Sequence, residues 1–214
     1  MKVVALVLAL AVCSTAVEAS GLNLAWDNCG AFGTANKAFA CGTGVGDVTL
    51  FGSFVVSGEA QPFVGMQTWI DLQTDTGNVP GLWWSRCGSS GPMSIFSPTD
   101  NASTACQPIW SAPPQRAFWT FGQGFPLGGP GHVRMSIVWF MADEAIQQAQ
   151  PDVEYLAFAL KLRAQDMNLN ADCDGCAIPV CIVFNTLRLQ MSTYGMEGPG
   201  PAAVIENPMQ QAWV

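Results

Sequence analysis

The 214-residue chain contains little charge, because only 11% of its residues are Asp, Glu, Lys or Arg. Eight residues are basic and sixteen are acidic, which gives a net charge of −8, and no stretch gathers Lys and Arg into a cluster. Nucleic-acid backbones and anionic membrane surfaces are bound through such basic clusters, so neither is an expected partner. The scarcity of Glu, Lys and Arg also disfavours long helices, which these residues stabilise.

The sequence also lacks the short motifs of common enzyme classes. It has no G-x-S-x-G elbow, no P-loop, no H-E-x-x-H and no G-x-G-x-x-G after a strand. Its one histidine, His132, stands at the start of an alternating segment. Two carboxylates such as those of Asp71 and Glu154 are the catalytic groups of a glycosidase. Every chain contains acidic residues, however, so this pair alone does not indicate hydrolysis. No set of catalytic roles can be assembled, so we expect a non-enzymatic protein, with a secreted hydrolase as an alternative.

Long apolar runs are absent except at the start of the chain. A short positive start precedes the apolar residues 3–12 (VVALVLALAV), and residues 17–19 (VEA) place small side chains where a signal peptidase cleaves. The run is shorter than the ~20 residues needed to span a bilayer. We expect residues 1–19 to be a signal peptide and the mature chain to be secreted or extracytoplasmic, without a membrane span. A lipoprotein with a lipidated Cys13 is the alternative.

Apolar and polar residues alternate with a period of two along much of the remaining chain, which predicts half-buried antiparallel strands. The alternating segments are 47–56, 63–72, 132–140, 153–163 and 181–191, and residues 116–121 (RAFWTF) add another strand. The side chains expected to face the core are Val48, Leu50, Phe54, Val56, Val64, Met66, Ile70, Leu72, Val133, Met135, Ile137, Trp139, Leu156, Phe158, Leu160, Leu162, Val183, Leu187, Leu189 and Met191. Tyr155, Lys161 and Arg163 are expected to face outward.

Segments rich in Gly, Pro and Ser separate these strands, and only residues 143–150 (DEAIQQAQ) have a helical character. Six or more strands with long connections predict an all-β fold, an antiparallel β-sandwich with a jelly roll as its candidate topology. We expect the sandwich to occupy residues 20–195. Residues 196–214 are expected to form an irregular Gly/Pro-rich tail.

Seven cysteines remain after removal of the signal peptide, and in an exported protein their default role is to form disulfides. They are Cys29, Cys41, Cys87, Cys106, Cys173, Cys176 and Cys181. Cys87 with Cys106 and Cys29 with Cys41 are the natural local pairs. A third bond would join two of the last three and leave one thiol over, either buried or bridging to a partner chain. Spacing alone does not choose the connectivity.

Cys173 and Cys176 form a C-x-x-C motif that is also found in metal sites and redox dithiols. A zinc site needs further ligands, and a redox dithiol opens a helix in a βαβ unit. Here the motif precedes the strand-like residues 178–184 (IPVCIVF). This context favours a structural disulfide.

Oxygen-bearing side chains alternate just ahead of that motif, at Asp166, Asn168, Asn170, Asp172 and Asp174. Carboxylate and amide oxygens are the ligands that calcium prefers, and the pattern resembles the front half of a calcium-binding loop. Ala171 stands where the sharp turn usually has Gly, and Ala177 stands where a closing carboxylate is usual. Calcium is the one cofactor that the sequence suggests, and a solvated hairpin loop is the alternative.

Exposed tryptophans in a secreted β-sandwich can form platforms on which sugar rings stack. Trp83 and Trp84 are adjacent, so one of them would point outward on a strand. Together with Trp110 and Trp119 they are candidates for a glycan-binding platform. The alternative is that the tryptophans fill the core, where their large apolar area is best used.

Six segments (LAWDNCG, NKAFACGT, GSFVV, GMQTWIDLQTD, PGLWWSRCG and CDGCAIPVCIVFNTLRL) together resemble an uncharacterised family of small exported bacterial proteins, over residues 22–191. The resemblance implies secretion and brings no activity, cofactor or catalytic residue. We therefore expect a secreted or surface-exposed, non-enzymatic β-sandwich that binds a ligand, with a glycan as the sharpest form. A purely structural or assembly component is the alternative.

Overall fold

The computed structural model describes residues 21–38, 47–57, 62–74, 93–96, 105–110, 116–123, 131–140, 148–162, 178–191, 202–206 and 211–213. Its elements are β1 (Gly21–Trp26), the 3-10 turn η1 (Gly30–Phe32), β2 (Val48–Val55), β3 (Phe63–Gln73), β4 (Met93–Phe96), β5 (Gln107–Pro108), β6 (Arg116–Gln123), β7 (His132–Phe140), β8 (Glu154–Leu162), β9 (Cys181–Met191), β10 (Ala202–Glu206) and β11 (Gln211–Trp213). The segment expected to be a signal peptide lies outside these residues.

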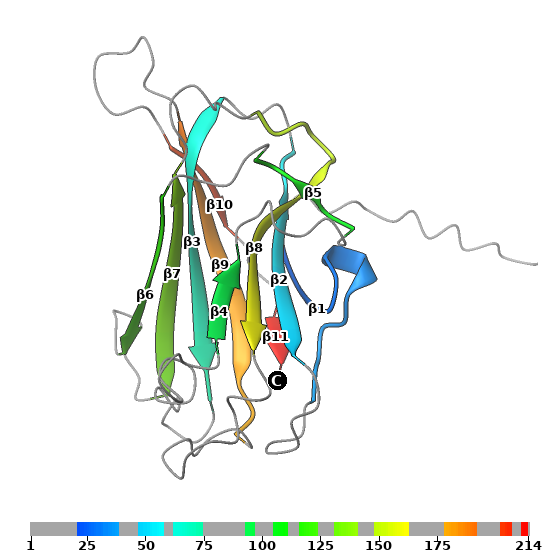
Figure 1. The fold of residues 1–214 in the computed structure, drawn as a ribbon, viewed down its shortest axis with the longest axis vertical. Helices are drawn as coiled ribbons and strands as arrows, with labels where there is room; N and C mark the ends of the chain where they lie inside the picture. The colour runs from blue at the N-terminus through cyan, green and yellow to red at the C-terminus, as the bar shows by residue number, and fades with distance from the viewer. Residues whose placement is uncertain are drawn as a thin grey trace, which may run out of the picture.

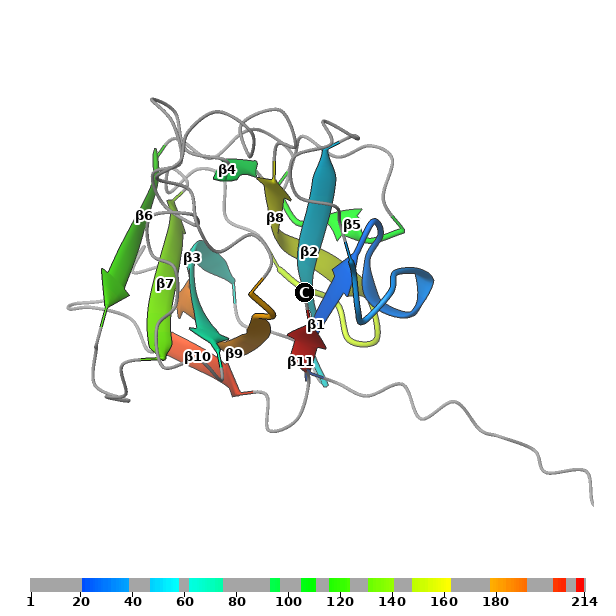
Figure 2. The ribbon, with the colours of Figure 1, turned by 90° about the horizontal axis from the view of Figure 1, so that it is seen from below.

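The strands form two sheets that face each other (Figure 1; Figure 2). The five-stranded sheet has the order β1-β2-β8-β4, with β5 added beside β8, and the six-stranded sheet has the order β10-β9-β3-β7-β6, with β11 added beside β9. Among the described strands, every strand pairing is antiparallel except the short one between β5 and β8. This arrangement confirms the predicted all-β antiparallel sandwich.

The chain crosses repeatedly between the two sheets. It does so from β2 to β3, from β3 to β4, from β5 to β6, from β7 to β8 and from β8 to β9. Jelly rolls are also built from two sheets joined by such crossings. The crossings fit the expected sandwich, and the jelly-roll topology itself stays a prediction.

The C-terminal segment contributes to the six-stranded sheet. β10 pairs with residues 186–190 of β9 and β11 pairs with residues 181–183, both in antiparallel register. The sequence predicted an irregular tail over 196–214, and in its described parts this prediction is wrong. Backbone pairing with β9 orders these short segments despite the surrounding Gly and Pro, because the edge of β9 offers unpaired backbone groups.

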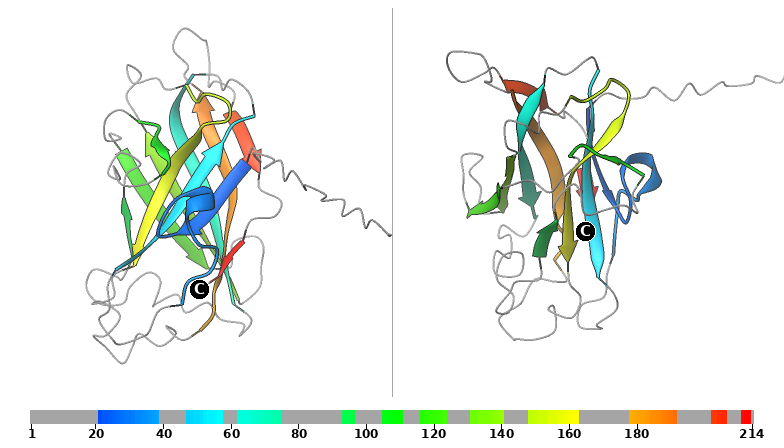
Figure 3. Two further views of the ribbon diagram at one scale, coloured as in Figure 1. Left: turned by 90° about the vertical axis from the view of Figure 1, so that its right-hand side faces the viewer. Right: turned by 45° about the horizontal axis from the view of Figure 1, so that its top comes forward.

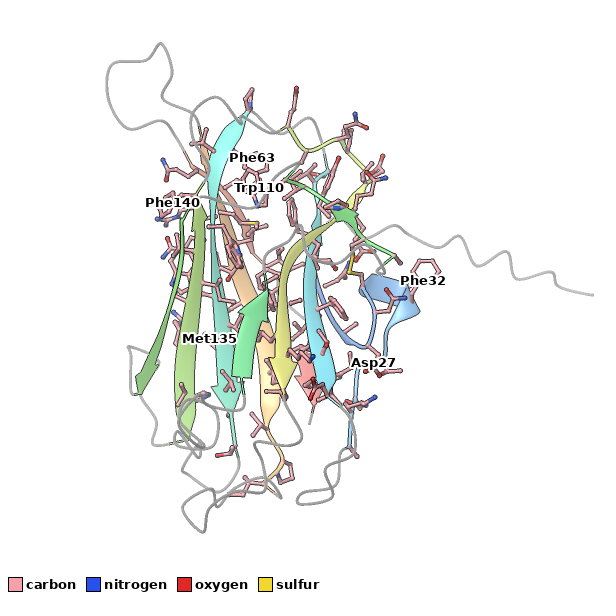
Figure 4. All side chains as sticks on the ribbon, in the orientation of Figure 1. Asp27, Phe32, Phe63, Trp110, Met135 and Phe140 are labelled. Atoms are coloured by element: carbon pink, nitrogen blue, oxygen red, sulfur yellow. A yellow bond between two sulfur atoms is a disulfide. The ribbon has the colours of Figure 1, made fainter. Side chains whose placement is uncertain are left out.

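The main core lies between the sheets and confirms the predicted inward faces of β2 and β7. Its largest fully buried side chains include Trp26, Trp110, Phe54, Phe63, Phe158 and Phe184. Figure 4 shows Phe63, Trp110 and Met135 between the two layers, whereas Phe32 and Phe140 point away from the core on opposite sides of the molecule. The alternation predicts these faces correctly because successive side chains of a strand point to opposite sides of its sheet.

A β-bulge changes the faces of β8. Its pairing with β2 shifts between Gly52 and Ser53, where the partner changes from Phe158 to Leu156 and one residue is skipped. Phe158, Leu160 and Leu162 face the main core as predicted. Tyr155, predicted to face outward, is buried in the main core, and Leu156 belongs to a second cluster on the other face. The prediction failed at these two positions because a bulge inverts the alternation on one side of it.

Similar irregularities alter β3 and β9. The pairing of these strands shifts between Phe63 and Gly65, so Phe63 is fully buried and Val64, predicted to face the core, is only half-buried. A second shift at Trp69 and Ile70 places Ile182 and Phe184 in the core in place of the predicted Val183. The inward positions of Met66, Ile70, Leu72, Leu187 and Leu189 are confirmed. The side chain of Met191 lies outside the described part.

A cover formed by residues 27–38, together with Cys106, lies over the outer face of the five-stranded sheet. Figure 3 shows η1 on the side of β1 and β2 that faces away from the other sheet. A disulfide joins Cys29 to Cys106, whose Cα atoms are 5.6 Å apart. Together with Phe51, Leu156 and Ala159 the two cysteines form a small buried cluster. The expected local pairs of Cys29 with Cys41 and Cys87 with Cys106 are therefore wrong, because the fold brings distant segments together here.

The remaining expectations about local structure fall mostly outside the described residues. Cys41, Cys87, Cys173 and Cys176 are among them, whereas Cys181 is a buried thiol at the start of β9. Of the expected helix at 143–150, only residues 148–150 are described, and they have no regular structure. Within the described segments, no helix has the length and apolar character that crossing a bilayer requires.

Candidate functional site

Polar and aromatic side chains line the outer face of the six-stranded sheet, along the middle of β3. Gln67, Trp69 and Asp71 alternate with the core residues of that strand and are half-buried. The register sets Trp69 opposite Ser136 and Asp71 opposite Arg134 on β7. Because directly opposite residues share a face of the sheet, these side chains lie next to one another.

A carboxylate held by two neighbouring strands anchors this face. Arg134 donates from Nε to Oδ1 of Asp71 at 2.6 Å and from a terminal nitrogen to Oδ2 at 2.7 Å. Nδ2 of Asn185 on β9 donates to the same Oδ2 at 2.6 Å. The hydrogen bonds that Arg134 donates to Asp71, together with the negative charge of that carboxylate, raise the pKa of Arg134 above its ordinary value, against the opposing effect of burial. A two-point contact between a guanidinium and a carboxylate fixes the orientation of both side chains and is stronger than a single hydrogen bond.

Asn185 reaches Asp71 because of the irregularity in β9. The pairing of β3 with β9 passes from Trp69↔Thr186 to Ile70↔Phe184, so that Asn185 has no directly opposite residue on β3. The extra residue of a bulge is often re-aimed in this way, and bulges are common beside functional sites. Three strands thus contribute to one hydrogen-bonded group.

Trp69 lies beside this group and is covered by an arginine. The guanidinium carbon of Arg188 lies 5.3 Å from the centre of the Trp69 ring, which is cation–π distance. Arg188 itself is exposed. On the other side, Nε2 of Gln67 donates to Oγ of Ser136 at 3.3 Å. We call the surface made by Gln67, Trp69, Asp71, Arg134, Ser136, Asn185 and Arg188 the Trp69 face.

Of the residues proposed from sequence as a sugar platform, only Trp110 has a side chain among those that the structure describes. Trp110 is buried in the core, 5.4 Å from the ring of Phe63 in an edge-to-face contact, so it is not a platform residue. Trp119 lies on β6, where only its backbone is described. Trp83 and Trp84 lie outside the described residues. The fold uses Trp110 as core, which was the alternative stated for the tryptophans.

The candidate calcium ligands Asp166, Asn168, Asn170, Asp172 and Asp174 also lie outside the described residues. Within the part of the chain that the structure describes, no group of three or more His, Cys, Asp and Glu side chains is placed to hold a metal ion. The calcium site therefore stays a prediction from sequence.

The acids nominated for hydrolysis lie on opposite faces of the sandwich. Glu154 belongs to the five-stranded sheet, where its Oε1 accepts from Asn23 at 2.8 Å and from the buried Ser53 at 2.7 Å. Asp71 is on the outer face of the other sheet. His132 begins β7 opposite Gln73, at one end of that sheet. Asp71 and Glu154 therefore do not form a pair that could act on one substrate.

Sequence reasoning assigned no functional role to the members of the Trp69 face other than Asp71, which are Gln67, Trp69, Arg134, Ser136, Asn185 and Arg188. A signal for part of this set is present, because Gln67, Trp69 and Asp71 are the polar-face positions of the same alternation that predicted the core positions of β3. Asn185 carries no such signal, because its position depends on the bulge.

Comparison with protein-family models, with curated proteins and with solved structures finds no match to this chain. A functional conclusion therefore rests on the fold and on the chemistry of the Trp69 face.

Proposed function

We propose that the protein is a secreted, non-enzymatic β-sandwich that binds a carbohydrate on the Trp69 face. The observation that carries the proposal is an indole on the outer face of a sheet, surrounded by amide, hydroxyl, carboxylate and guanidinium groups. A sugar ring has an apolar C–H face that packs on an aromatic ring and a rim of hydroxyls that both donate and accept hydrogen bonds. The Trp69 face offers partners for both.

Preorganisation also supports a binding role. The side chains of Asp71, Arg134 and Asn185 are held by one another and rise from three neighbouring strands, so they lose little freedom when a ligand arrives. Sites built on strands are also more precise than sites built on loops.

Secretion is supported by the cysteine chemistry. A disulfide such as the one between Cys29 and Cys106 forms and persists in oxidising compartments. An apolar start of signal-peptide length precedes the described chain. Both observations are consistent with an extracytoplasmic protein.

The test is a glycan array followed by titration calorimetry on the mature protein. We expect wild type to bind at least one class of glycan, and Trp69→Ala to weaken that binding by roughly tenfold or more, the scale of losing one aromatic contact. Phe32→Ala is the matched control, because Phe32 is 74% exposed on the opposite side of the molecule. Binding that survives Trp69→Ala unchanged, in a variant that is still folded, would overturn the proposal.

The alternative is a structural or assembly component, for which the edge of the six-stranded sheet is the relevant feature. Among the described strands β6 pairs only with β7, so it is an edge strand of eight residues. Edge strands can pair with another chain. An absence of glycan binding together with concentration-dependent self-association in sedimentation velocity would favour this alternative.

A further inference from the structure

Most of the Lys and Arg side chains in the described part of the protein are paired with an acid. Four Lys and Arg side chains are described, and three of them form ion pairs, Lys37 with Asp27, Arg134 with Asp71, and Lys161 with Asp47. The fourth, Arg188, lies over the ring of Trp69 instead. The chain has twice as many acidic as basic residues, so acidic partners are plentiful. Arg188 nevertheless contacts an aromatic ring and is exposed to solvent.

We propose, on the basis of the carbohydrate-binding function above, that the sugar bound at the Trp69 face is acidic. Its carboxylate, as in a uronic acid, would pair with the guanidinium of Arg188 while its ring packs on Trp69. Arginine suits this role because its planar fork donates two parallel hydrogen bonds to a carboxylate and stays charged at every accessible pH.

The position of Arg188 over the ring of Trp69 creates the selectivity between acidic and neutral sugars. With its guanidinium 5.3 Å from the ring centre, Arg188 covers the surface on which a sugar must pack. A neutral sugar has to displace the guanidinium and lose the cation–π contact without a replacement. An acidic sugar exchanges that contact for charge-assisted hydrogen bonds, which are stronger. The guanidinium of Arg188 therefore blocks the ring of Trp69 until an acidic ligand draws it away, and a neutral ligand does not draw it away.

The neighbouring charges are compatible with this exchange. The carboxylate of Asp71 is already held by Arg134 and Asn185, so these contacts occupy it and leave the guanidinium of Arg188 to the ligand. The net charge of −8 repels polyanions at long range. The ligand class is therefore a glycan in which single uronic acids alternate with neutral sugars, and not a densely charged polymer.

The experiment compares an oligosaccharide of alternating uronic acid and neutral N-acetylated sugar with its carboxyl-reduced form, in which each carboxylate is replaced by a hydroxymethyl group. For wild type we expect the acidic form to bind about tenfold more tightly, the scale of a hydrogen bond to a charged group. Arg188→Ala should weaken the acidic form by a similar factor. The same substitution should leave the reduced form equal or tighter, because it uncovers the ring of Trp69.

Lys161→Ala is the matched control, because it removes a cation that is paired with Asp47 on the other sheet, and it should change neither affinity. Equal loss of both ligands in Trp69→Ala would support the carbohydrate-binding face itself. If Arg188→Ala leaves the preference for the acidic form intact, or if wild type has no such preference, the inference is overturned while the carbohydrate-binding proposal stands. If wild type binds neither form, and no glycan on the array, both proposals fail.

Discussion

Cys29 and Cys106 are 77 residues apart in the sequence, and their disulfide joins the turn at η1 to the segment that contains β5. The bond closes the cover over Phe51, Leu156 and Ala159, which would otherwise be an apolar patch on the outer face of the five-stranded sheet. The sandwich thus buries apolar side chains in two places, between the sheets and beneath this cover.

Removing that disulfide should cost much stability. In the chain-entropy model a loop of this length contributes about 4 kcal/mol, because the bond restricts the unfolded chain. We expect the double variant Cys29→Ala with Cys106→Ala to lose stability on that scale in urea denaturation. Reduction of wild type should produce at least the same loss. A change below about 1 kcal/mol would show that the bond restricts the unfolded chain far less than the model requires.

Gly52 should be intolerant of any side chain. An added Cβ would collide with the ring of Phe158, which is fully buried in the main core and cannot move aside. We expect Gly52→Ala to lower the unfolding free energy by ~1–3 kcal/mol, the usual cost of overpacking. Thermal and urea denaturation measure it, and combining it with Phe158→Leu should recover part of the loss.

Gly65→Ala provides the control for that prediction. There the nearest atom to an added Cβ is a ring carbon of Phe140 at 3.1 Å, and this ring is 38% exposed. The ring can shift toward solvent, and the next nearest atoms, Cβ of Gln190 and the carbonyl oxygen of Trp139, are 3.3 Å away. Gly65→Ala should therefore lower the unfolding free energy by clearly less than Gly52→Ala does. Equal losses for the two glycines would contradict the assigned role of Phe158.

The pair of Asp71 and Arg134 should couple more strongly than an exposed ion pair. Its side chains are only 13% and 22% exposed, and the contact has two points. A double-mutant cycle with Asp71→Asn and Arg134→Gln should give a coupling energy of about 1–2 kcal/mol. The pair of Asp47 and Lys161, with side chains 37% and 33% exposed, should give less than ~0.5 kcal/mol. Similar coupling energies for the two pairs would contradict the claim that burial and two-point contact strengthen the pair of Asp71 and Arg134.

Cys181 should make stability depend on pH in alkaline solution. Burial raises the pKa of its thiol, so as the pH rises the unfolded chain loses this proton first. The contribution of the protonated Cys181 thiol to the unfolding free energy is complete below the ordinary thiol pKa. It is lost as the pH rises from there toward the raised pKa of the folded state. Between pH ~8 and ~10 the unfolding free energy of wild type should fall more steeply than that of Cys181→Ala. Parallel curves would contradict this assignment.

Calcium binding by Asp166, Asn168, Asn170, Asp172 and Asp174 stays a prediction from sequence. An ion that binds only the native state raises its melting temperature by mass action. A site without a closing carboxylate should have an affinity in the weak extracellular range of ~10⁻⁴–10⁻³ M. Millimolar calcium should therefore raise the melting temperature of wild type and not that of Asp172→Ala. Melting curves that ignore both calcium and chelator would leave this segment as a hairpin loop.

The sequence by itself determined the fold class and most of the core. Val48, Leu50, Phe54 and Val56 share one face because side chains of a strand alternate between the two sides of its sheet, a local rule that needs no knowledge of neighbours. The same rule places three of the seven residues of the Trp69 face on one side, since Gln67, Trp69 and Asp71 occupy the outward positions of β3.

The tertiary structure decided which strands are neighbours and where their register breaks. Asn185 reaches Asp71 across 114 residues, and Cys29 meets Cys106 across 77. The bulges also arise only when two strands pair. One of them buries Tyr155, and the other leaves Asn185 without a directly opposite residue on β3. Such contacts depend on how two sheets pack as wholes, and no local pattern of residues records that choice, because each strand can satisfy its own alternation beside several different partners.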